Sequence, residues 1–233
     1  MEINAAAMWF MTTFMQFDMN IASLVHKLYE FAAWLFTPLA EAFAFIGDPI
    51  PVVALGVVLI LFRKTRKYGV AMFLSFAIGA LITNCCIKLL VARPRPFADQ
   101  TANLLSSLLG ADKKNFYKDM WLSVGQSMES DNSFPSGHTC AAMASAVAIF
   151  MVGNKKVSWL AFLYPIFMAI SRIYLIVHYA TDVFAGAVVG LIAALIAMLL
   201  VYPRIPSGFF EINFFRKSGK GKKAASGGKH LAK

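Results

Sequence analysis

Apolar residues along this chain are concentrated in six blocks, separated by glycine, proline, aspartate or basic residues. The blocks comprise residues 31–46, 50–62, 69–92, 137–152, 157–177 and 183–202. A helix that crosses a lipid bilayer needs about 20 mostly apolar residues, within a range of roughly 17–25. Three blocks reach or approach this length and three are shorter. The pattern therefore predicts a chain built largely from membrane-spanning helices.

The first two blocks could form one helix or two. Between them lies Gly47-Asp48-Pro49-Ile50-Pro51, a cluster that breaks helices, and a merged helix would be too long for one crossing. We therefore predict two separate helices, with the first extended back toward Ile21. The expected fold is all-α, an integral membrane bundle of six transmembrane helices.

The N-terminal stretch 5–17 is apolar but too short to cross a bilayer. No positively charged segment precedes it, which argues against a cleaved signal peptide. We predict an interfacial helix within residues 1–20. Because no internal repeat and no second folded domain is apparent, residues 21–203 are expected to form the six-helix membrane domain.

Composition supports the membrane class and draws attention to the tail. The chain is 59% hydrophobic with a mean hydropathy of +0.64, whereas soluble domains are typically about 45–50% apolar. The formal net charge is +10, and residues 204–233 combine many lysines with Gly, Ser and Ala, which predicts a disordered, basic tail. The tail has neither interleaved aromatic residues nor a nucleic-acid-binding fold behind it. Attraction to anionic lipids or a role in topology is therefore favoured over nucleic-acid binding.

The order of the blocks places several polar side chains on one side of the membrane. Block 69–92 ends at the long polar loop 93–134, block 137–152 starts from it, and block 157–177 returns to the same side. At about 1.5 Å per residue, Lys88, Arg172 and His178 lie roughly 28, 22 and 31 Å along their blocks. The same side receives the following residues from the loops and the last helix: Arg95, Ser136, His138 and Asp182.

Basic residues mark the opposite side as cytoplasmic. That side carries Arg63, Lys64, Arg66, Lys67, Lys155, Lys156 and the tail, whereas the basic residues of loop 93–134 are diluted by acidic ones. By the positive-inside rule, the polar residues face outward and both termini lie in the cytoplasm.

The residues that converge could bind a phosphoryl group. Lys88, Arg95 and Arg172 are cations, and arginine binds phosphate oxygens bidentately. Ser136-Gly137 lies just before a predicted helix, where backbone N–H groups point toward an anion. Together these residues are typical of a receptor for a tetrahedral oxyanion.

Two histidines next to such a receptor suggest chemistry. An imidazole titrates near pH 6.5, so it can attack phosphorus or donate a proton. His178 and Asp182 are four residues apart and share a face if the segment is helical, and the carboxylate would then make the other ring nitrogen more basic. We interpret His178 as the nucleophile.

These residues together resemble the three-part signature of the type 2 phosphatidic acid phosphatase superfamily. The matching elements are Lys88-(six residues)-Arg95-Pro96, then Pro135-Ser136-Gly137-His138, then Ser171-Arg172-(five residues)-His178-(three residues)-Asp182. The resemblance covers roughly residues 69–202. Arg93-Pro94 is a second Arg-Pro pair, but the six-residue gap selects Arg95 and leaves Arg93 as an accessory cation or an interfacial anchor.

The resemblance implies a mechanism that needs no metal and no cofactor. His178 would form a phosphohistidine, Asp182 would orient it, and His138 would protonate the leaving oxygen and later activate water. The phosphoryl oxygens would be held by Lys88, Arg95, Ser136, Gly137 and Arg172.

The resemblance also implies a substrate class: a membrane lipid phosphate or diphosphate, processed at the outer face of the cell membrane. Undecaprenyl diphosphate is the leading candidate, followed by phosphatidic acid, phosphatidylglycerophosphate and diacylglycerol diphosphate. A non-catalytic anionic-lipid binder or a transporter would explain the cations but not two histidines and an aspartate. Vanadium-dependent haloperoxidases share the anion pocket but are soluble.

Overall fold

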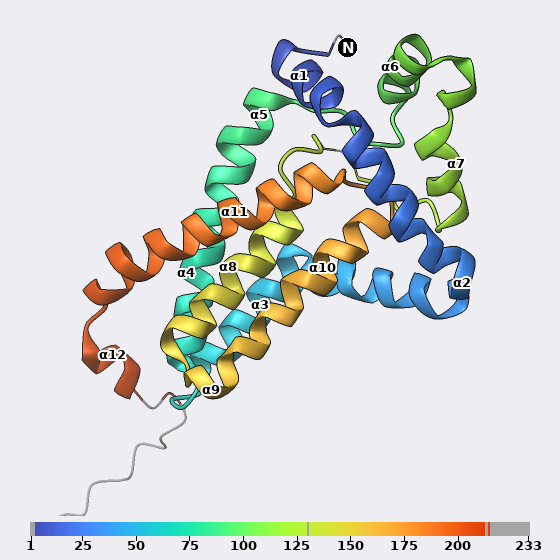
Figure 1. Ribbon diagram of the computed structural model, residues 1–233. Coiled ribbons are helices and arrows are strands. Elements are labelled where there is room, and N and C mark those ends of the chain that lie inside the picture. Colours follow the sequence, from blue (N-terminus) through green and yellow to red (C-terminus); the bar gives the residue numbers. More distant parts are fainter. Residues whose placement is uncertain (1–2, 130, 213, 215–233) are drawn as a thin grey trace, which may run out of the picture.

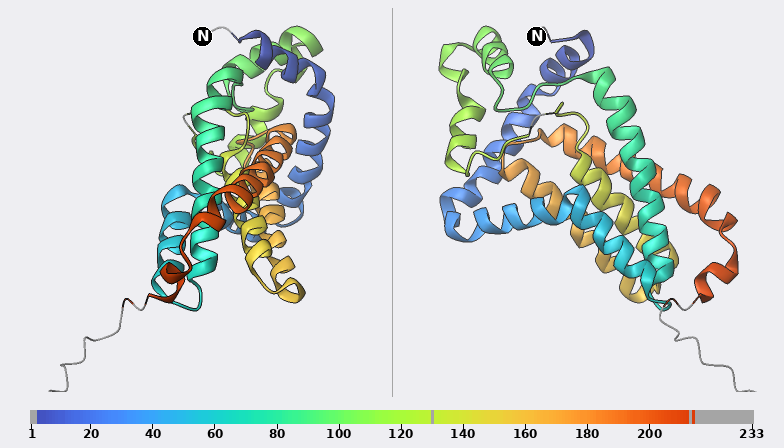
Figure 2. Two further views of the ribbon diagram at one scale, coloured as in Figure 1. Left: turned by 90° about the vertical axis from the view of Figure 1, so that its left-hand side faces the viewer. Right: turned by 180° about the vertical axis from the view of Figure 1, so that it is seen from behind.

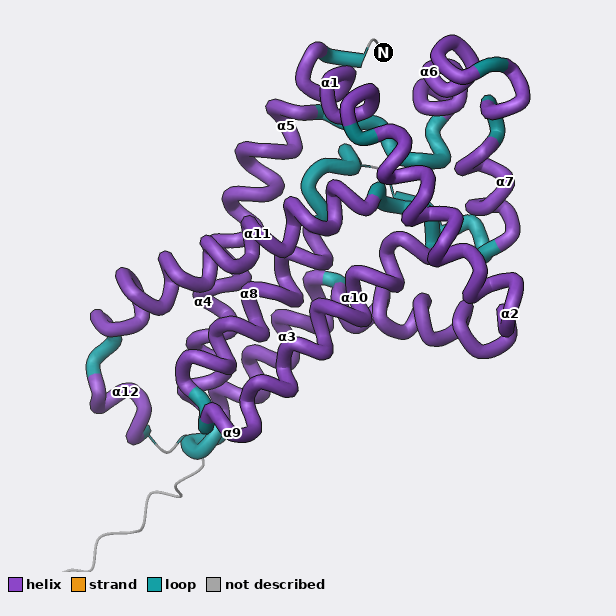
Figure 3. The backbone as a smooth tube through the Cα atoms, in the orientation of Figure 1, coloured by secondary structure: helices purple, strands orange, loops and turns teal. Residues whose placement is uncertain are grey.

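A computed structural model describes residues 3–129, 131–212 and 214, and within these ranges the chain contains helices and loops but no strand (Figures 1 and 3). The all-α prediction is confirmed. The helices are α1 (Ala5–Thr13), α2 (Met15–Gly47), α3 (Pro49–Leu61), α4 (Arg66–Ala80), α5 (Lys88–Val91), α6 (Asp99–Leu109), α7 (Phe116–Ser123), α8 (Gly137–Val152), α9 (Lys155–Ser158), α10 (Leu163–Tyr174), α11 (Ala180–Ile196) and α12 (Ser207–Glu211).

Four helical stretches are long and apolar enough to cross a membrane, judged by length and composition: Met15–Gly47, Arg66–Val91, Lys155–Tyr174 and Ala180–Arg204. The apolar helices Pro49–Leu61 and Gly137–Val152 are shorter. These six elements correspond to the six predicted blocks, and the chain has the architecture of a multi-pass membrane protein. That all six cross the membrane stays a prediction.

Helix α2 differs from the predicted first membrane helix. It begins at Met15 rather than near Ile21, and the backbone at Ala32 leaves helical geometry, with φ −158° and ψ 68°. The two halves of α2 therefore run in different directions (Figure 1). The predicted break is present, because α2 ends at Gly47 and Pro49 opens α3.

Helix α8 lies in the middle of the bundle and contacts α4, α10 and α11. Many of its residues are small and buried, including Ala142, Ala144 and Ala148, so that its neighbours can approach closely. On α11, a Cβ at Gly186 would lie only 2.5 Å from the carbonyl oxygen of Ser136. Glycine at this position therefore allows the start of α8 to meet the first turns of α11.

One end of the molecule carries the long loop that the sequence indicated. Helices α6 and α7 lie at the same end as α1, opposite the α3–α4 turn and α9 (Figures 1 and 2). Helix α1 is anchored by buried Ala7 and Met11, and the ring of Phe10 lies 4.3 Å from that of Phe134. The location of α1 at a membrane interface stays a prediction.

The basic tail lies mostly beyond the described residues. All of its lysines, and Arg216, fall among residues 215–233. The described beginning of the predicted tail is partly helical, since it contains α12.

Candidate active site

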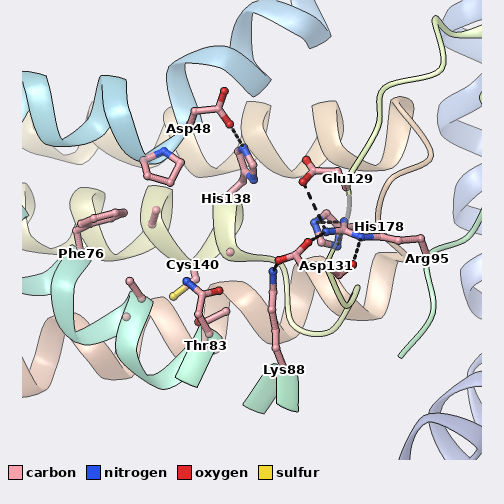
Figure 4. A pocket seen from close by; sticks show the side chains of 17 residues that line it. Asp48, Phe76, Thr83, Lys88, Arg95, Glu129, Asp131, His138, Cys140 and His178 are labelled. Atoms are coloured by element: carbon pink, nitrogen blue, oxygen red, sulfur yellow. Dashed lines mark hydrogen bonds and ion pairs between the residues drawn. The ribbon is translucent and has the colours of Figure 1, made fainter. Parts of the chain in front are cut away.

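Five of the eight predicted site residues line a single cavity of about 220 Å³: Lys88, Arg95, Gly137, His138 and His178. The wall is completed by residues that the sequence did not single out, among them Asp48, Phe76, Thr83, Glu129 and Asp131 (Figure 4). Ser136, Arg172 and Asp182 are buried next to these residues but do not line the cavity.

A turn, rather than a continuous helix, brings His178 to Asp182. Helix α10 ends at Tyr174, and Ile176 has the left-handed φ of 54°, which is rare for a β-branched residue. The helical geometry on which the predicted pairing was conditional is therefore absent. Asp182 instead lies in the first turn of α11, and its Oδ2 is 3.6 Å from Nδ1 of His178.

Asp182 is held by an array of hydrogen bonds. Arg93 Nη1 donates to its Oδ1 at 2.7 Å, while the Tyr179 backbone N–H donates to Oδ2 at 3.0 Å and the Ser133 hydroxyl also donates to Oδ2. Arg93 Nη2 also lies 2.8 Å from Oδ2 of Asp18, so this arginine joins two buried carboxylates. The sequence left Arg93 as an accessory cation or an interfacial anchor, and in the structure it bridges α2 and α11.

The two carboxylates raise the pKa of Arg93 further above its usual value, although burial acts in the opposite direction. Arg93 is therefore a fixed positive charge behind Asp182. The signal that could have indicated this role was Asp18, an isolated acid in an apolar stretch.

Arg95 reaches the other side of the His178 ring. Its Nη1 lies 3.0 Å from Nε2 of His178 and donates to the Val177 carbonyl oxygen at 2.7 Å. Burial lowers the pKa of His178 well below its usual value, and the positive charge of Arg95 acts in the same direction, against the opposing effect of Asp182. The ring is therefore neutral at pH 7, with Nδ1 toward Asp182 and the Nε2 lone pair accepting from Arg95.

Each predicted phosphate-binding cation is paired with a carboxylate from the loop before α8. Lys88 and Arg95 both contact Asp131, and Arg172 contacts Glu129, whose Oε2 is also 3.7 Å from Arg95 Nη2. Burial raises the pKa of Asp131, but Lys88 and Arg95 outweigh it, so that the net pKa is lowered. Asp131 is therefore ionised at neutral pH, and both carboxylates contact the cations that were expected to hold phosphoryl oxygens.

The start of α8 has two separate tasks. Ser136 is the N-cap, and its Oγ accepts from the Thr139 backbone N–H at 3.4 Å, so this hydroxyl is used inside the helix rather than at the cavity. Gly137, at the first helical position, lines the cavity, and the first N–H groups of a helix have no partner within it. His138 follows, with Nε2 at 3.0 Å from Oδ1 of Asp48.

Arg172 retains one unused donor. Its side chain is almost fully buried, and within the described residues its Nε has no hydrogen-bond partner. No group of three or more His, Cys, Asp or Glu residues that could hold a metal ion is found in the described part of the chain.

The chain is similar to several known proteins. It is 30% identical over 141 residues to an undecaprenyl-diphosphatase of Sulfolobus acidocaldarius, which covers 60% of this chain and 57% of the relative. It is also 30% identical over 115 residues to the undecaprenyl-diphosphatase BcrC of Bacillus subtilis, covering 49% of each. The matches therefore span about half the length of these relatives.

A solved structure shares the fold. The crystal structure of a transmembrane PAP2-type phosphatidylglycerolphosphate phosphatase from Bacillus subtilis superimposes with a TM-score of 0.51 at 22% identity, covering 89% of this chain and all of that one. The family model described as the PAP2 superfamily matches residues 64–206, a range that contains every predicted site residue. The chain belongs to the PAP2 superfamily.

Proposed function

We propose that this protein is a metal-independent membrane lipid phosphatase that removes the terminal phosphate of a lipid phosphate or diphosphate. The observation that carries the proposal is the shared cavity, at which cations from α5 and the following loop meet two histidines from α8 and the turn before α11. Undecaprenyl diphosphate is the proposed substrate, because two relatives are named undecaprenyl-diphosphatase.

The first step would be attack by His178 on phosphorus. Asp182 faces Nδ1 of His178 at 3.6 Å, so Nε2 is the nucleophilic atom. Arg95, which donates a hydrogen bond to Nε2, has to donate that bond to a phosphoryl oxygen instead. The N–P bond forms, the bond from phosphorus to the leaving oxygen breaks, and His138 supplies a proton to that oxygen. The positive charge of Lys88, Arg95 and Arg172 stabilises the phosphoryl oxygens as charge redistributes.

The second step would release phosphate. Water attacks phosphorus, His138 takes a proton from this water, and the N–P bond breaks with the electron pair returning to His178. Each histidine returns to its starting state, so no external acid or base is consumed.

The proposed orientation places the site on the outer face of the cell membrane, with six spanning helices and both termini in the cytoplasm. It is supported by the position of the basic residues, which lie at the end of the molecule opposite α6 and α7 (Figure 1). Lys67 lies in the first turn of α4, and Lys155 and Lys156 begin α9, all at the end opposite α6 and α7.

Phosphate release by the purified protein, in a chelator, tests the function. The panel contains undecaprenyl diphosphate, phosphatidic acid, phosphatidylglycerophosphate and diacylglycerol diphosphate. We expect turnover of at least one lipid, its loss in His178→Ala, and near-normal turnover in His26→Ala, because His26 stacks on Tyr29 of α2 and does not line the cavity. Binding of these lipids without any turnover would favour a non-catalytic binder and contradict the proposal.

A further inference from the structure

The break between α2 and α3, at Gly47 and Asp48, packs against the imidazole ring of His138. Asp48 is the N-cap residue of α3, with extended backbone at φ −62° and ψ 149°. Its Oδ1 lies 3.0 Å from Nε2 of His138, across 90 residues of sequence. The Asp48 side chain is half exposed, at 51%, whereas that of His138 is 13% exposed. The half-exposed carboxylate thus points at a largely buried ring (Figure 4).

Gly47 contacts the same ring. A Cβ at Gly47 would lie 2.9 Å from Cδ2 of His138 and 2.4 Å from Cε of Met168, so only glycine lets the backbone come this close. The imidazole is therefore limited along one edge by the backbone of Gly47 and is hydrogen-bonded at the adjacent nitrogen by Asp48. Two consecutive residues of the break fix the orientation of one ring.

The charges around His138 give the carboxylate an electrostatic role. Burial opposes a proton on the His138 ring most strongly, and the cations Arg172, Arg95 and Lys88 act in the same direction, while Glu129 favours the proton. Asp48 adds a negative charge in direct contact with the ring. A general acid in this position needs such a partner to carry a proton next to three fixed cations.

We propose that Asp48 is a positioning residue that holds His138 as the Nε2–H tautomer and leaves Nδ1 to transfer the proton. The inference rests on the proposed function. In the first step, the proton on Nδ1 would pass to the leaving oxygen as the P–O bond breaks, and the proton on Nε2 would stay bonded to the ring and remain donated to Asp48. In the second step, the free Nδ1 would take the proton of the attacking water. The same atom thus serves both steps.

The arrangement repeats the pairing at the nucleophile. His178 faces Asp182 through one nitrogen and Arg95 through the other, and His138 faces Asp48 through Nε2. Within the described residues, Nδ1 of His138 has no hydrogen-bond partner, so it is the nitrogen that remains for a substrate oxygen.

The test compares two leaving groups. Phosphatidic acid expels an alkoxide, which depends strongly on protonation, whereas undecaprenyl diphosphate expels a phosphate monoester, which does not. For Asp48→Asn, we expect kcat on phosphatidic acid to fall about 10- to 100-fold, less than the 10²–10⁴-fold typical of a lost general acid. The decrease with the diphosphate should be only a few-fold, KM should change little, and Asp48→Glu should restore part of the rate.

Three controls make the result specific. Asp112→Asn changes an exposed acid that pairs with Lys113 outside the cavity and should have no effect. In a His138→Ala background, Asp48→Asn should cause no further loss. The ¹⁵N shifts of His138 in labelled protein should report a single Nε2–H tautomer in the parent and a mixture in Asp48→Asn.

The outcomes separate this inference from the proposed function. An equal loss with both leaving groups, an additional loss in the His138→Ala background, or an unchanged tautomer in Asp48→Asn would overturn the role of Asp48. Absence of turnover of every lipid by the parent protein would instead overturn the proposed function, and the tautomer measurement would still decide the pairing.

Discussion

Glu129 and Asp131 occupy the positions around Lys88, Arg95 and Arg172 that the proposed function assigns to phosphoryl oxygens. Carboxylate and phosphoryl oxygens compete for the same N–H donors, because arginine and lysine bind both. A phosphorylated lipid therefore has to displace two protein carboxylates before it can contact the cations. The affinity of the site for phosphate is the difference between these two sets of contacts.

Neutralising the two acids should tighten anion binding. In Glu129→Gln/Asp131→Asn, we expect the inhibition constant of orthovanadate to decrease about threefold to tenfold, since the carboxylates of these ion pairs are 24% and 50% exposed and an exposed pair contributes about 0.2–1 kcal/mol. The measurement is competitive inhibition of lipid phosphate hydrolysis. Asp99→Asn is the matched control, because Asp99 pairs with Lys118 outside the cavity. Weaker vanadate binding in the double variant would contradict the inference that Glu129 and Asp131 compete with the anion for the cations.

His178 should remain neutral in mildly acidic solution. Because its pKa is lowered in the folded protein, the unfolded chain takes up this proton first as the pH falls below about 6.5. The contribution of His178 to stability is therefore present above that pH and is lost on acidification. In ¹⁵N-histidine-labelled protein, with the signal assigned by His178→Gln, we expect no protonation of His178 at pH 6. A titration midpoint of His178 at or above pH 6.5 would contradict the effect of burial and of the Arg95 charge on this ring.

The sequence identified site residues whose spacing is local and left out those whose contacts are distant. Lys88, Arg95 and His178 belong to short motifs with recognisable spacing, and the structure brings them together. Asp48 meets His138 across 90 positions, and Asp18 meets Arg93 across 75. No periodicity links such pairs, because their distance is set by how whole helices pack.

At the scale of helices, hydrophobic blocks predicted which elements exist but not how they bend. The six blocks correspond to apolar helices, since burial in lipid or protein requires continuous apolar sequence. The bend at Ala32 and the π-helical segment Leu81–Ile87 before Lys88 were not predicted. Both are changes of backbone geometry within apolar sequence, so a hydropathy pattern does not detect them.

The close approach of α8 and α11 should be sensitive to one methyl group. In Gly186→Ala, the new Cβ would meet the Ser136 carbonyl oxygen at 2.5 Å, which has to push the start of α8 away from Asp182. We expect a loss of about 1–3 kcal/mol in stability and a lower kcat. Thermal unfolding in detergent and lipid phosphate hydrolysis measure the two effects.

Gly208→Ala is the matched control for this helix contact. Among the described residues other than its chain neighbours, none has an atom within 4 Å of the Cβ position at Gly208, so its substitution should leave both measurements unchanged. Equal stability and equal kcat of the two alanine variants would show that the α8–α11 contact can accommodate a methyl group, and would contradict the prediction.

At the scale of the whole molecule, charge and site are separated along the bundle. The cavity is lined by Glu129, Asp131 and the start of α8, toward the end that carries α6 and α7, whereas α9, which begins with Lys155 and Lys156, lies at the other end (Figure 1). If the basic end faces the cytoplasm, a substrate reaches the cavity from the outer leaflet. The orientation then determines which pool of lipid the enzyme can use.

Single cysteines can determine this orientation in intact cells. In a background without Cys85, Cys86 and Cys140, a membrane-impermeant maleimide should label Ala111→Cys from outside, because this residue is exposed in the loop between α6 and α7. Asn154→Cys, exposed at the opposite end, should react only after lysis. The reverse pattern would place the cavity in the cytoplasm.

The packing of α1 has a practical consequence for handling the protein. Phe10 touches Phe134, the residue directly before Pro135-Ser136-Gly137-His138, and the Asn4 side chain donates to the Leu90 carbonyl oxygen at 3.1 Å. Removal of the first dozen residues would therefore remove packing contacts from the segment that leads into the proposed site. A purification handle or fusion partner is therefore better placed at the C-terminus, away from the contacts of Asn4 and Phe10.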